Sequence, residues 1–247
     1  MYNRPMTNKA FQIRICDTCG LRYPLIDGNA FGTRCPICMG DTRLVLSREL
    51  ILEPTRNPIT DLTASTGSAH RPNPSPTRAE RSGSEDEAAS RGLTVLLDNI
   101  RSAWNVGSIL RSADGFGFSH VYLCGITPTP DGPAREAVTK TSLGAEDSVT
   151  WSYHKDAVKL IHRLKKEGWK IWVLEESERA TSISQAPSLN PDEHAVLIAG
   201  SEVTGVDPEL LDLSDEIYYI PMRGEKKSFN VAMAFSIAAY ALSNHDI

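Results

Sequence analysis

The sequence predicts an α/β domain with a mostly parallel sheet, preceded by a small metal-binding module. Two observations carry this prediction. From residue 93 onward, short apolar runs alternate with helical patterns, which is typical of a parallel sheet covered by helices. Before that point, four cysteines are spaced as two CxxC pairs. In an intracellular chain this spacing indicates metal binding before disulfides.

The elements of the α/β domain follow from the periodicity of apolar residues. In the first predicted helix, Val106, Ile109, Leu110 and Ala113 share one face. The helix near the middle of the domain is amphipathic, and the last one is almost entirely apolar. The predicted strands are 93–98, 120–126, 170–176, 195–202 and 216–222, and the predicted helices are 105–117, 154–169 and 229–242.

The chain divides into three parts. We predict a zinc-ribbon module over residues 1–53 and the α/β domain over residues 93–247. Residues 54–92 between them are dense in Pro, Ser, Thr and Gly and nearly free of large apolar side chains. Such a segment cannot bury enough surface to offset its ordering entropy, so we predict a flexible linker.

Composition and charge restrict the class of protein. The 247 residues are 40% hydrophobic and carry a formal net charge of −5, distributed as +2 over residues 1–53, 0 over 54–92 and −7 over 93–247. A polyanion would have to be bound by local basic patches. No apolar run approaches the ~20 residues of a membrane span, and the first residues lack the apolar part of a secretory signal. We expect a cytoplasmic protein with no membrane partner.

The cysteine module is expected to hold a structural zinc ion. Four thiolates can close a tetrahedral site without leaving a position for a substrate, and Gly20 and Gly40 suit the turns after each pair. Zinc would also stabilise a module this small. Cys124 stands apart and is predicted to be a buried core thiol. The predicted ligands are Cys16, Cys19, Cys35 and Cys38.

The surface of this module has two interpretations. Its arginines could bind phosphates and its aromatic residues could stack on a base, or all of them could form an ordinary solvated surface. The residues concerned are Arg14, Arg22, Arg34, Arg43, Tyr23 and Phe31.

Three polar clusters lie at predicted strand exits of the α/β domain. The first, DNIRSAWNVGSILRSADGFGF (98–118), places Asn105 where a helix N-cap would lie and Arg111 six residues later. Free N–H groups at that helix start would suit an anion such as phosphate. The second is the turn GSEVTG (200–205). The third is IPMRGEKKSFNVAMAF (220–235), in which Ser228 could cap the last helix. Each cluster alone is weak support for a ligand site.

Together, the three clusters resemble, in order and spacing, the three motifs of the SpoU/TrmH family of RNA 2′-O-ribose methyltransferases in the SPOUT superfamily. The matching text is NVGSILRSA (105–113), GSEVTG and IPMRGEKKSFNV, and the resemblance spans about residues 93–243. KTSLGAE (140–146) is similar to the middle segment of the family. Phe229 stands where leucine is usual, which is expected to reshape the cofactor pocket.

The resemblance implies a parallel sheet whose C-terminal part is threaded into a trefoil knot. It also implies a homodimer with S-adenosylmethionine in the knot and tRNA or rRNA approaching across the dimer interface. The implied polar, catalytic residues are Asn105, Arg111, Glu202, Ser228 and Asn230, and the implied cofactor-binding residues are Gly200, Ile220, Met222 and Phe229. Beside them, Arg223, Lys226 and Lys227 form a basic patch in an acidic domain, and we expect them to contact RNA phosphates.

The reaction implied is transfer of a methyl group from S-adenosylmethionine to a ribose 2′-hydroxyl. Because a guanidinium is a poor base, we expect Arg111 to act as an electrostatic clamp on the 2′-oxygen and a neighbouring phosphate. Glu202 would orient that arginine or the ribose. The acceptor of the proton, the RNA and the nucleotide stay open. Two alternatives are a zinc-ribbon RNA-binding adapter that has lost catalysis and a methyltransferase that acts on a base.

Overall fold

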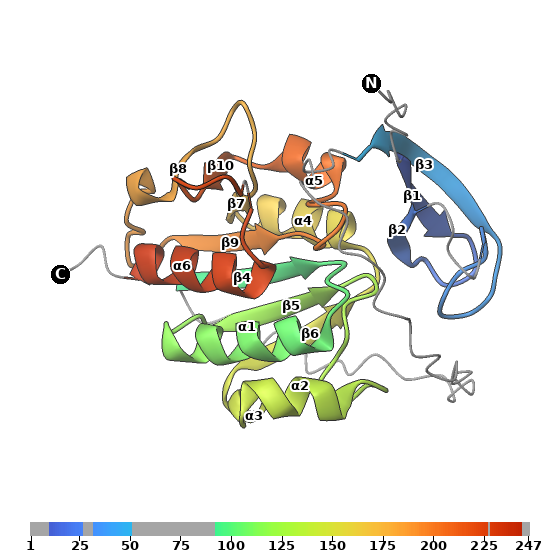
Figure 1. Cartoon of the computed structure of the whole chain (residues 1–247), viewed down its shortest axis with the longest axis horizontal. Helices are drawn as coiled ribbons and strands as arrows, with labels where there is room; N and C mark the ends of the chain where they lie inside the picture. Colours follow the sequence, from blue (N-terminus) through green and yellow to red (C-terminus); the bar gives the residue numbers. More distant parts are fainter. Residues whose placement is uncertain (1–9, 27–31, 51–91, 227, 244–247) are drawn as a thin grey trace, which may run out of the picture.

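The computed structural model describes residues 10–26, 32–50, 92–226 and 228–243. They form two sheets (Figure 1). The first is small and antiparallel, with strand order β2-β1-β3. Its strands are β1 Ala10–Cys16, β2 Arg22–Ile26 and β3 Thr42–Glu49.

The large sheet has seven strands in the order β6-β5-β4-β9-β7-β10-β8, and all its neighbouring strands run parallel. The predicted mostly parallel α/β sheet is therefore confirmed. Its strands are β4 Gly92–Asp98, β5 His120–Cys124, β6 Thr150–His154, β7 Lys170–Leu174, β8 Thr181–Ser182, β9 His194–Ala199 and β10 Glu216–Tyr219.

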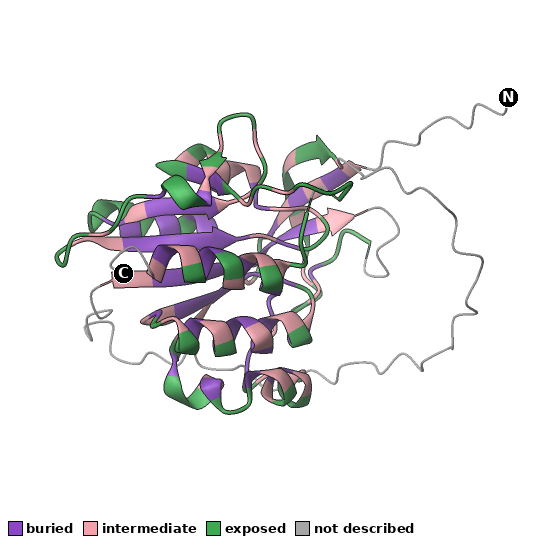
Figure 2. Cartoon of the chain, turned by 60° about the vertical axis from the view of Figure 1, so that its left-hand side comes forward, coloured by how far each residue is buried: buried purple, intermediate pink, exposed green. Residues whose placement is uncertain are grey.

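Helices cover both faces of this sheet, and the burial of its strands follows from that (Figure 2). Alternate residues of one strand point to opposite faces, so Val95 and Leu97 of β4 pack in the core beneath α1 and α6, whereas Leu96 packs in the core beneath α4 and α5. The helices are α1 Ala103–Gly115, α2 Arg135–Ser142, α3 Ala145–Ser148, α4 Ala157–Lys166, α5 Pro208–Leu213 and α6 Val231–Ser243, with a short 3₁₀ turn η1 at Ile183–Gln185.

The strand order places a topological switch between β4 and β9. From β4 the chain builds outward through β5 to β6, and it then returns to build β7, β9 and β10 on the other side of β4. The loops that leave β4 and β9 therefore diverge at neighbouring carboxyl ends. In open parallel sheets this is where ligands bind.

The small sheet lies beyond the carboxyl ends of the large sheet's strands (Figure 1). The proposed linker, residues 54–92, lies outside the described residues except Gly92, which opens β4. Cys124 is fully buried under α4, which confirms its prediction as a core thiol. No helix among the described segments is both long and apolar enough to cross a membrane.

Candidate active site

Glu202 joins the loop after β9 to the start of α1. Its carboxylate accepts hydrogen bonds from the backbone N–H of Arg101 at 2.8 Å, from the N–H of Ser102 at 3.0 Å and from Nδ2 of Asn105 at 2.8 Å. Burial acts to raise the pKa of Glu202, but the bonds from these amides outweigh it and lower the pKa below the usual value. Glu202 is therefore an ionised carboxylate at neutral pH, and its oxygens are already bonded within the protein.

The start of α1 differs from the prediction in two ways. Ser102 is the N-cap, because its hydroxyl accepts the N–H of Asn105, and Asn105 is the third residue of the helix. In addition, a carboxylate of the chain already lies at this helix start, because Glu202 accepts the N–H groups of Arg101 and Ser102. The anion at this helix start is thus supplied by the chain itself.

Asn230 connects the third sequence cluster to the same site. Its Nδ2 donates to Oδ1 of Asn105 at 3.2 Å, while its own Oδ1 accepts the N–H of Ala232 at 3.0 Å. Asn230 thereby caps α6, a position that the sequence had suggested for Ser228. The contacts form one chain, Glu202–Asn105–Asn230, and the structure brings the three sequence clusters together. Ser228 is exposed, two residues before Asn230.

Arg111 lies apart from this chain of contacts. It is exposed on α1, six positions after Asn105, which places it about 9 Å farther along the helix axis and about 120° around it. It lines an open hollow of about 360 Å³ together with residues 142–145. In the described part of a single chain, the hydrogen bonds of Glu202 go to the start of α1 and not to Arg111. The expectation that Glu202 orients this arginine therefore has no support within one chain.

The predicted cofactor residues lie in loops that leave β9 and β10, two strands separated only by β7. Gly200 is half-buried, and a Cβ there would lie 2.3 Å from the N of Val206, because Ser201 and Gly205 pair and fold the loop back on itself. Ile220 packs partly against the core. Met222 is half-buried and Phe229 is exposed. The set offers main chain and apolar surface at the carboxyl edge of the sheet, which suits a nucleoside ligand.

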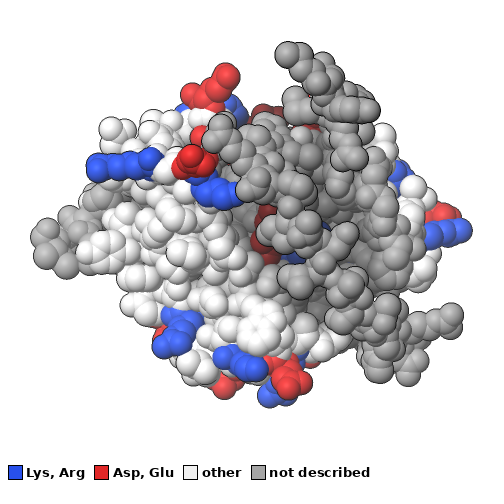
Figure 3. Space-filling model, viewed as in Figure 1, with Lys and Arg blue, Asp and Glu red and all other residues white. Residues whose placement is uncertain are grey.

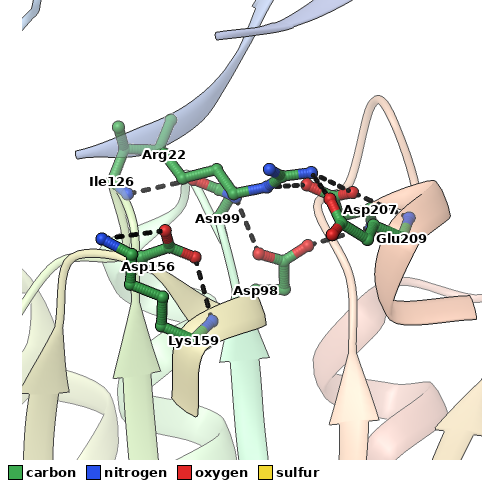
Figure 4. A network of polar contacts seen from close by, with 8 residues as sticks. All are labelled: Arg22, Asp98, Asn99, Ile126, Asp156, Lys159, Asp207 and Glu209. Carbon is green, nitrogen blue, oxygen red and sulfur yellow. Dashed lines mark hydrogen bonds and ion pairs between the residues drawn. The ribbon is translucent and has the colours of Figure 1, made fainter. Parts of the chain in front are cut away.

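Two carboxylates hold these loops in place, half-buried Glu175 and buried Asp98, and neither is among the residues predicted from the sequence. Oε2 of Glu175, at the exit of β7, accepts the N–H of Val206 at 3.1 Å. Oδ2 of Asp98, at the exit of β4, accepts the N–H of Asp207 at 3.0 Å (Figure 4). Burial, aided by the charge of Asp207, raises the pKa of Asp98 to about 7. An acidic residue directly after a buried apolar strand was the signal that could have found both.

The four cysteines converge. Their sulfurs all lie within 4.8 Å of one another, with Cys16 Sγ 3.5 Å from Cys38 Sγ and Cys19 Sγ 3.7 Å from Cys35 Sγ. A zinc ion bonded to four sulfurs at about 2.3 Å places them about 3.8 Å apart, so the cluster fits that metal. In the turn that follows the second cysteine pair, the residue with a positive φ is Met39 (60°) and not Gly40. The glycine is needed there because a Cβ would lie 2.5 Å from the hydroxyl of Thr18.

Two of the six residues proposed for RNA binding on the cysteine module are buried. Tyr23 is 1% exposed and cannot stack on a base, and Arg22 is buried against the large domain. Arg34 and Arg43 are exposed but pair with Asp41 and Asp17. Arg14 donates to Gln12 and Thr42, and Phe31 lies outside the described residues.

The basic patch beside the site is described in part. Arg223 and Lys226 are exposed in the loop between β10 and α6, where a phosphate can reach them. Lys227 lies outside the described residues.

A parallel sheet with three polar clusters meeting at its topological switch defines an α/β protein with a ligand site at the carboxyl edge. The sequence model of the SpoU rRNA Methylase family matches residues 92–240. The chain therefore belongs to the SpoU rRNA methylase family.

Two curated relatives bear RNA methyltransferase names. The 23S rRNA (guanosine(2553)-2′-O)-methyltransferase RlmP of Bacillus subtilis is 31% identical over 64% of this chain and 60% of its own length. The tRNA (guanosine(18)-2′-O)-methyltransferase of Thermus thermophilus is 29% identical over 60% of this chain and 72% of its own. The chain thus spans less than two thirds of the Bacillus relative.

Solved structures agree with the family assignment. A TrmH-family structure from Porphyromonas gingivalis matches with a TM-score of 0.57 and 32% identity, over 65% of this chain and 62% of that one. The A. aeolicus TrmH/SpoU tRNA modifying enzyme matches with a TM-score of 0.54 and 25% identity, over 61% of this chain and 73% of that one.

Proposed function

We propose that this protein transfers a methyl group from S-adenosylmethionine to a ribose 2′-hydroxyl of tRNA or rRNA. The observation that carries the proposal is the chain of contacts Glu202–Asn105–Asn230, which joins all three family clusters at the switch of the sheet. Family membership and the names of the relatives support the same reaction class. The trefoil knot and the boundaries of the two domains stay predictions, as does a cytoplasmic location.

S-adenosylmethionine is the proposed cofactor, and its sulfonium supplies an electrophilic methyl group when it is bound. Gly200, Ile220 and Phe229 would contribute main-chain contacts, and Met222 would lie close by. The support is positional: these residues lie in loops at the carboxyl edge of the sheet, beside the polar site.

The polar residues have separate proposed roles. Glu202 holds the two loops in register and does not accept the proton, because it is ionised but its oxygens are taken up by three N–H donors. Arg111 would hold the 2′-oxygen and a neighbouring phosphate with its guanidinium. Asn230 sets the start of α6, and Ser228 positions the backbone before it. Arg223, Lys226 and Lys227 would contact phosphates.

We propose a homodimer formed through α1 and α6. The side chains of Met233, Ile237 and Tyr240 form an apolar stripe on α6 and are 56%, 37% and 62% exposed. Figure 3 shows the surface over α6 largely free of charged side chains. Asn105 and Asn230 line the hollow of about 340 Å³ that borders this stripe, so a second copy seated there would bring its own groups to the site. That arrangement also gives exposed Arg111 a site to act on.

We propose a structural zinc ion bound by Cys16, Cys19, Cys35 and Cys38. The convergence of the four sulfurs supports it. With four protein ligands the ion would have no open position, so it would stabilise the module and take no part in the reaction.

The deciding experiment measures transfer of labelled methyl from S-adenosylmethionine to unmodified tRNA and rRNA, followed by digestion to nucleosides. The wild type is expected to yield one 2′-O-methylnucleoside, and Arg111→Ala is expected to yield none above background. A labelled base with an unmodified ribose would identify a base methyltransferase. RNA binding without any transfer would identify the inactive adapter. Either of these two results contradicts the proposed reaction.

A further inference from the structure

Arg22 belongs to the cysteine module but is buried against the large domain. It lies on β2, and its side chain is 6% exposed. Its Nε donates to Oδ2 of Asp207 at 2.7 Å, and its terminal nitrogen reaches Oδ1 of Asp207 at 3.0 Å and Oε2 of Glu209 at 2.9 Å (Figure 4). The planar guanidinium thus binds both oxygens of one buried carboxylate, a geometry that only arginine offers.

The backbone of β2 fits the large domain at the same place. The N–H of Arg22 donates to the carbonyl oxygen of Lys155, just after β6, at 2.9 Å. A Cβ on Gly125, just after β5, would lie 2.9 Å from the carbonyl oxygen of Arg22 and 2.1 Å from Oδ1 of Asn99. Ile126 packs against the apolar cluster of the cysteine module. The module is therefore seated on the residues that follow β5 and β6 and on Asp207, beside the candidate active site.

Asp207 is the junction between this contact and the active-site loops. It ends the loop that carries Glu202, and its side chain caps α5 by accepting the N–H of Glu209 at 3.0 Å. Its own N–H donates to Asp98, which begins the loop leading to Ser102. The two loops are thus joined at one end by Glu202 and at the other end by Asp98 and Asp207.

The charge balance makes Arg22 essential to this junction. The carboxylates of Asp98 and Asp207 are both buried, and that of Asp98 accepts the backbone N–H of Asp207. Arg22 is the buried cation that bonds to the carboxylate of Asp207. Two neighbouring buried carboxylates repel each other, and removal of a paired cation leaves a buried charge without compensation. Without Arg22, the loop end at Asp207 would have to move toward water.

We propose that Arg22 is a positioning residue for the methyl transfer: it holds Asp207, and through it the Glu202 loop, in place. The cysteine module is then a fixed part of the active-site scaffold and not a tethered RNA-binding arm. The proposal rests on the proposed function, because it assigns Arg22 a part in that reaction.

The test compares Arg22→Gln with Arg48→Gln in the full-length protein. Arg48 is exposed on β3 of the same module, so both variants lose one positive charge there. Hydrogen exchange would be followed in peptides covering residues 98–105 and 200–210, and zinc content, kcat and KM for RNA would be measured in parallel. Arg22→Gln is expected to raise exchange in both segments at least tenfold and to lower kcat at least tenfold. KM for RNA should stay within twofold and zinc should be retained, and Arg48→Gln should match the wild type.

Arg22→Lys is the second variant and serves if Arg22→Gln does not fold. It keeps the charge but not the two-bond geometry, so its kcat and exchange are expected to lie between those of the wild type and Arg22→Gln. Wild-type exchange at 200–210 in Arg22→Gln, or in Arg22→Lys where only that variant folds, would overturn the proposal. So would a raised KM for RNA at unchanged kcat, which would assign Arg22 to RNA binding. Failure of the proposed function can be told apart from failure of this proposal. If the function is wrong, the wild type transfers no methyl group, whereas hydrogen exchange still shows whether Arg22 holds the two loops.

Discussion

Asp98 and Glu202 form the same kind of bond in opposite directions. The carboxylate of Asp98, in the loop after β4, accepts the backbone N–H of Asp207 in the loop after β9. The carboxylate of Glu202, in the loop after β9, accepts the backbone N–H groups of Arg101 and Ser102 in the loop after β4. Each loop therefore satisfies the amides of the other, so a change in one is expected to disturb both.

Glu202→Gln should disrupt the polar site. A glutamine side chain has one acceptor oxygen and brings an NH₂ group toward the N–H donors of Arg101, Ser102 and Asn105. We expect a loss of about 1–3 kcal/mol of unfolding free energy, measured by urea titration, and a fall in kcat for methyl transfer. Glu225→Gln, in the exposed loop before α6, is the matched control and should change neither. Wild-type turnover in Glu202→Gln would show that the loop contact is dispensable.

Asp98 should make a measurable contribution to the pH dependence of the unfolding free energy. Its pKa is raised from 3.8 to about 7 by burial and by the charge of Asp207. Between about pH 4 and 7 the folded state therefore binds a proton that the unfolded chain has lost, so this group makes the unfolding free energy fall as pH rises through that range. His120 and His154 act in the opposite direction, because burial lowers the pKa of each from 6.5 to about 4.

The contribution of Asp98 to the unfolding free energy is obtained by comparing the wild type with Asp98→Asn. Unfolding free energies of the wild type and Asp98→Asn would be measured by urea titration at intervals from pH 4 to pH 8. The wild type should lose stability relative to the variant as pH rises, by up to about 1.4 kcal/mol for each unit of pKa shift. A difference that does not vary with pH would mean that Asp98 has no raised pKa.

Removal of one cysteine ligand should release the metal. Cys38→Ser is expected to lower zinc from one ion per chain to below half, and to lower the melting temperature, because a small module loses the bonds that stabilise it. Elemental analysis by mass spectrometry gives the zinc content. Cys124→Ala is the control: it is buried under α4, far from the cluster in the sequence, and should leave the zinc content unchanged. Equal zinc in both variants would argue against the four-cysteine site.

The apolar stripe on α6 should determine the oligomeric state. Met233→Glu places a charge among exposed apolar side chains and is expected to convert a dimer to a monomer in sedimentation equilibrium. Lys159→Glu, at an exposed position of α4 on the other face of the sheet, is the control and should leave the dimer intact. A wild type that sediments as a monomer would contradict the proposed dimer directly.

Gly125 offers a separate test of how the cysteine module is seated. Gly125→Ala would place a methyl group 2.1 Å from Oδ1 of Asn99 and 2.9 Å from the carbonyl oxygen of Arg22, in a backbone with a φ of 64°. Gly168→Ala is the control. Its backbone also has a positive φ, 87°, so it has the same kind of conformational strain, but nothing lies within 4 Å of the added Cβ. We expect Gly168→Ala to cost about 1 kcal/mol of unfolding free energy and Gly125→Ala at least ~2 kcal/mol more. Equal costs would show that Asn99 and the backbone of Arg22 do not pack closely against Gly125.

The elements that the sequence predicted well are those with a strong local pattern. The mostly apolar run at 93–98 and the almost entirely apolar segment at 229–242 correspond to β4 and α6 within two residues. The edge strand β6 Thr150–His154 was missed because its half-buried residues mix Ser, Tyr and His with one Trp. The short helices α2 and α5 were missed because each buries only one or two side chains and gives too little periodicity to detect.

The candidate site shows the same division. Clusters of polar residues at strand exits, and the motif order, were enough to nominate Asn105, Glu202 and Asn230. The hydrogen-bond partners of these residues could not be predicted from the sequence. The N-cap of α1 is Ser102, and the anion at that helix start is a carboxylate 100 residues away. Arg111 was nominated as well, yet within one chain it lies apart from these three.

By itself, the sequence determined the class of fold, the convergence of cysteines and the three motif clusters, since each depends on local spacing. Only the tertiary structure decided what the buried charges do. Nothing near Arg22 in the sequence indicates that it is buried. Its partner Asp207 lies 185 residues later in the chain, and only the fold brings the two side chains to 2.7 Å. The physical reason is that local pattern determines which face of an element is apolar, whereas the partner of a buried charge depends on which elements meet.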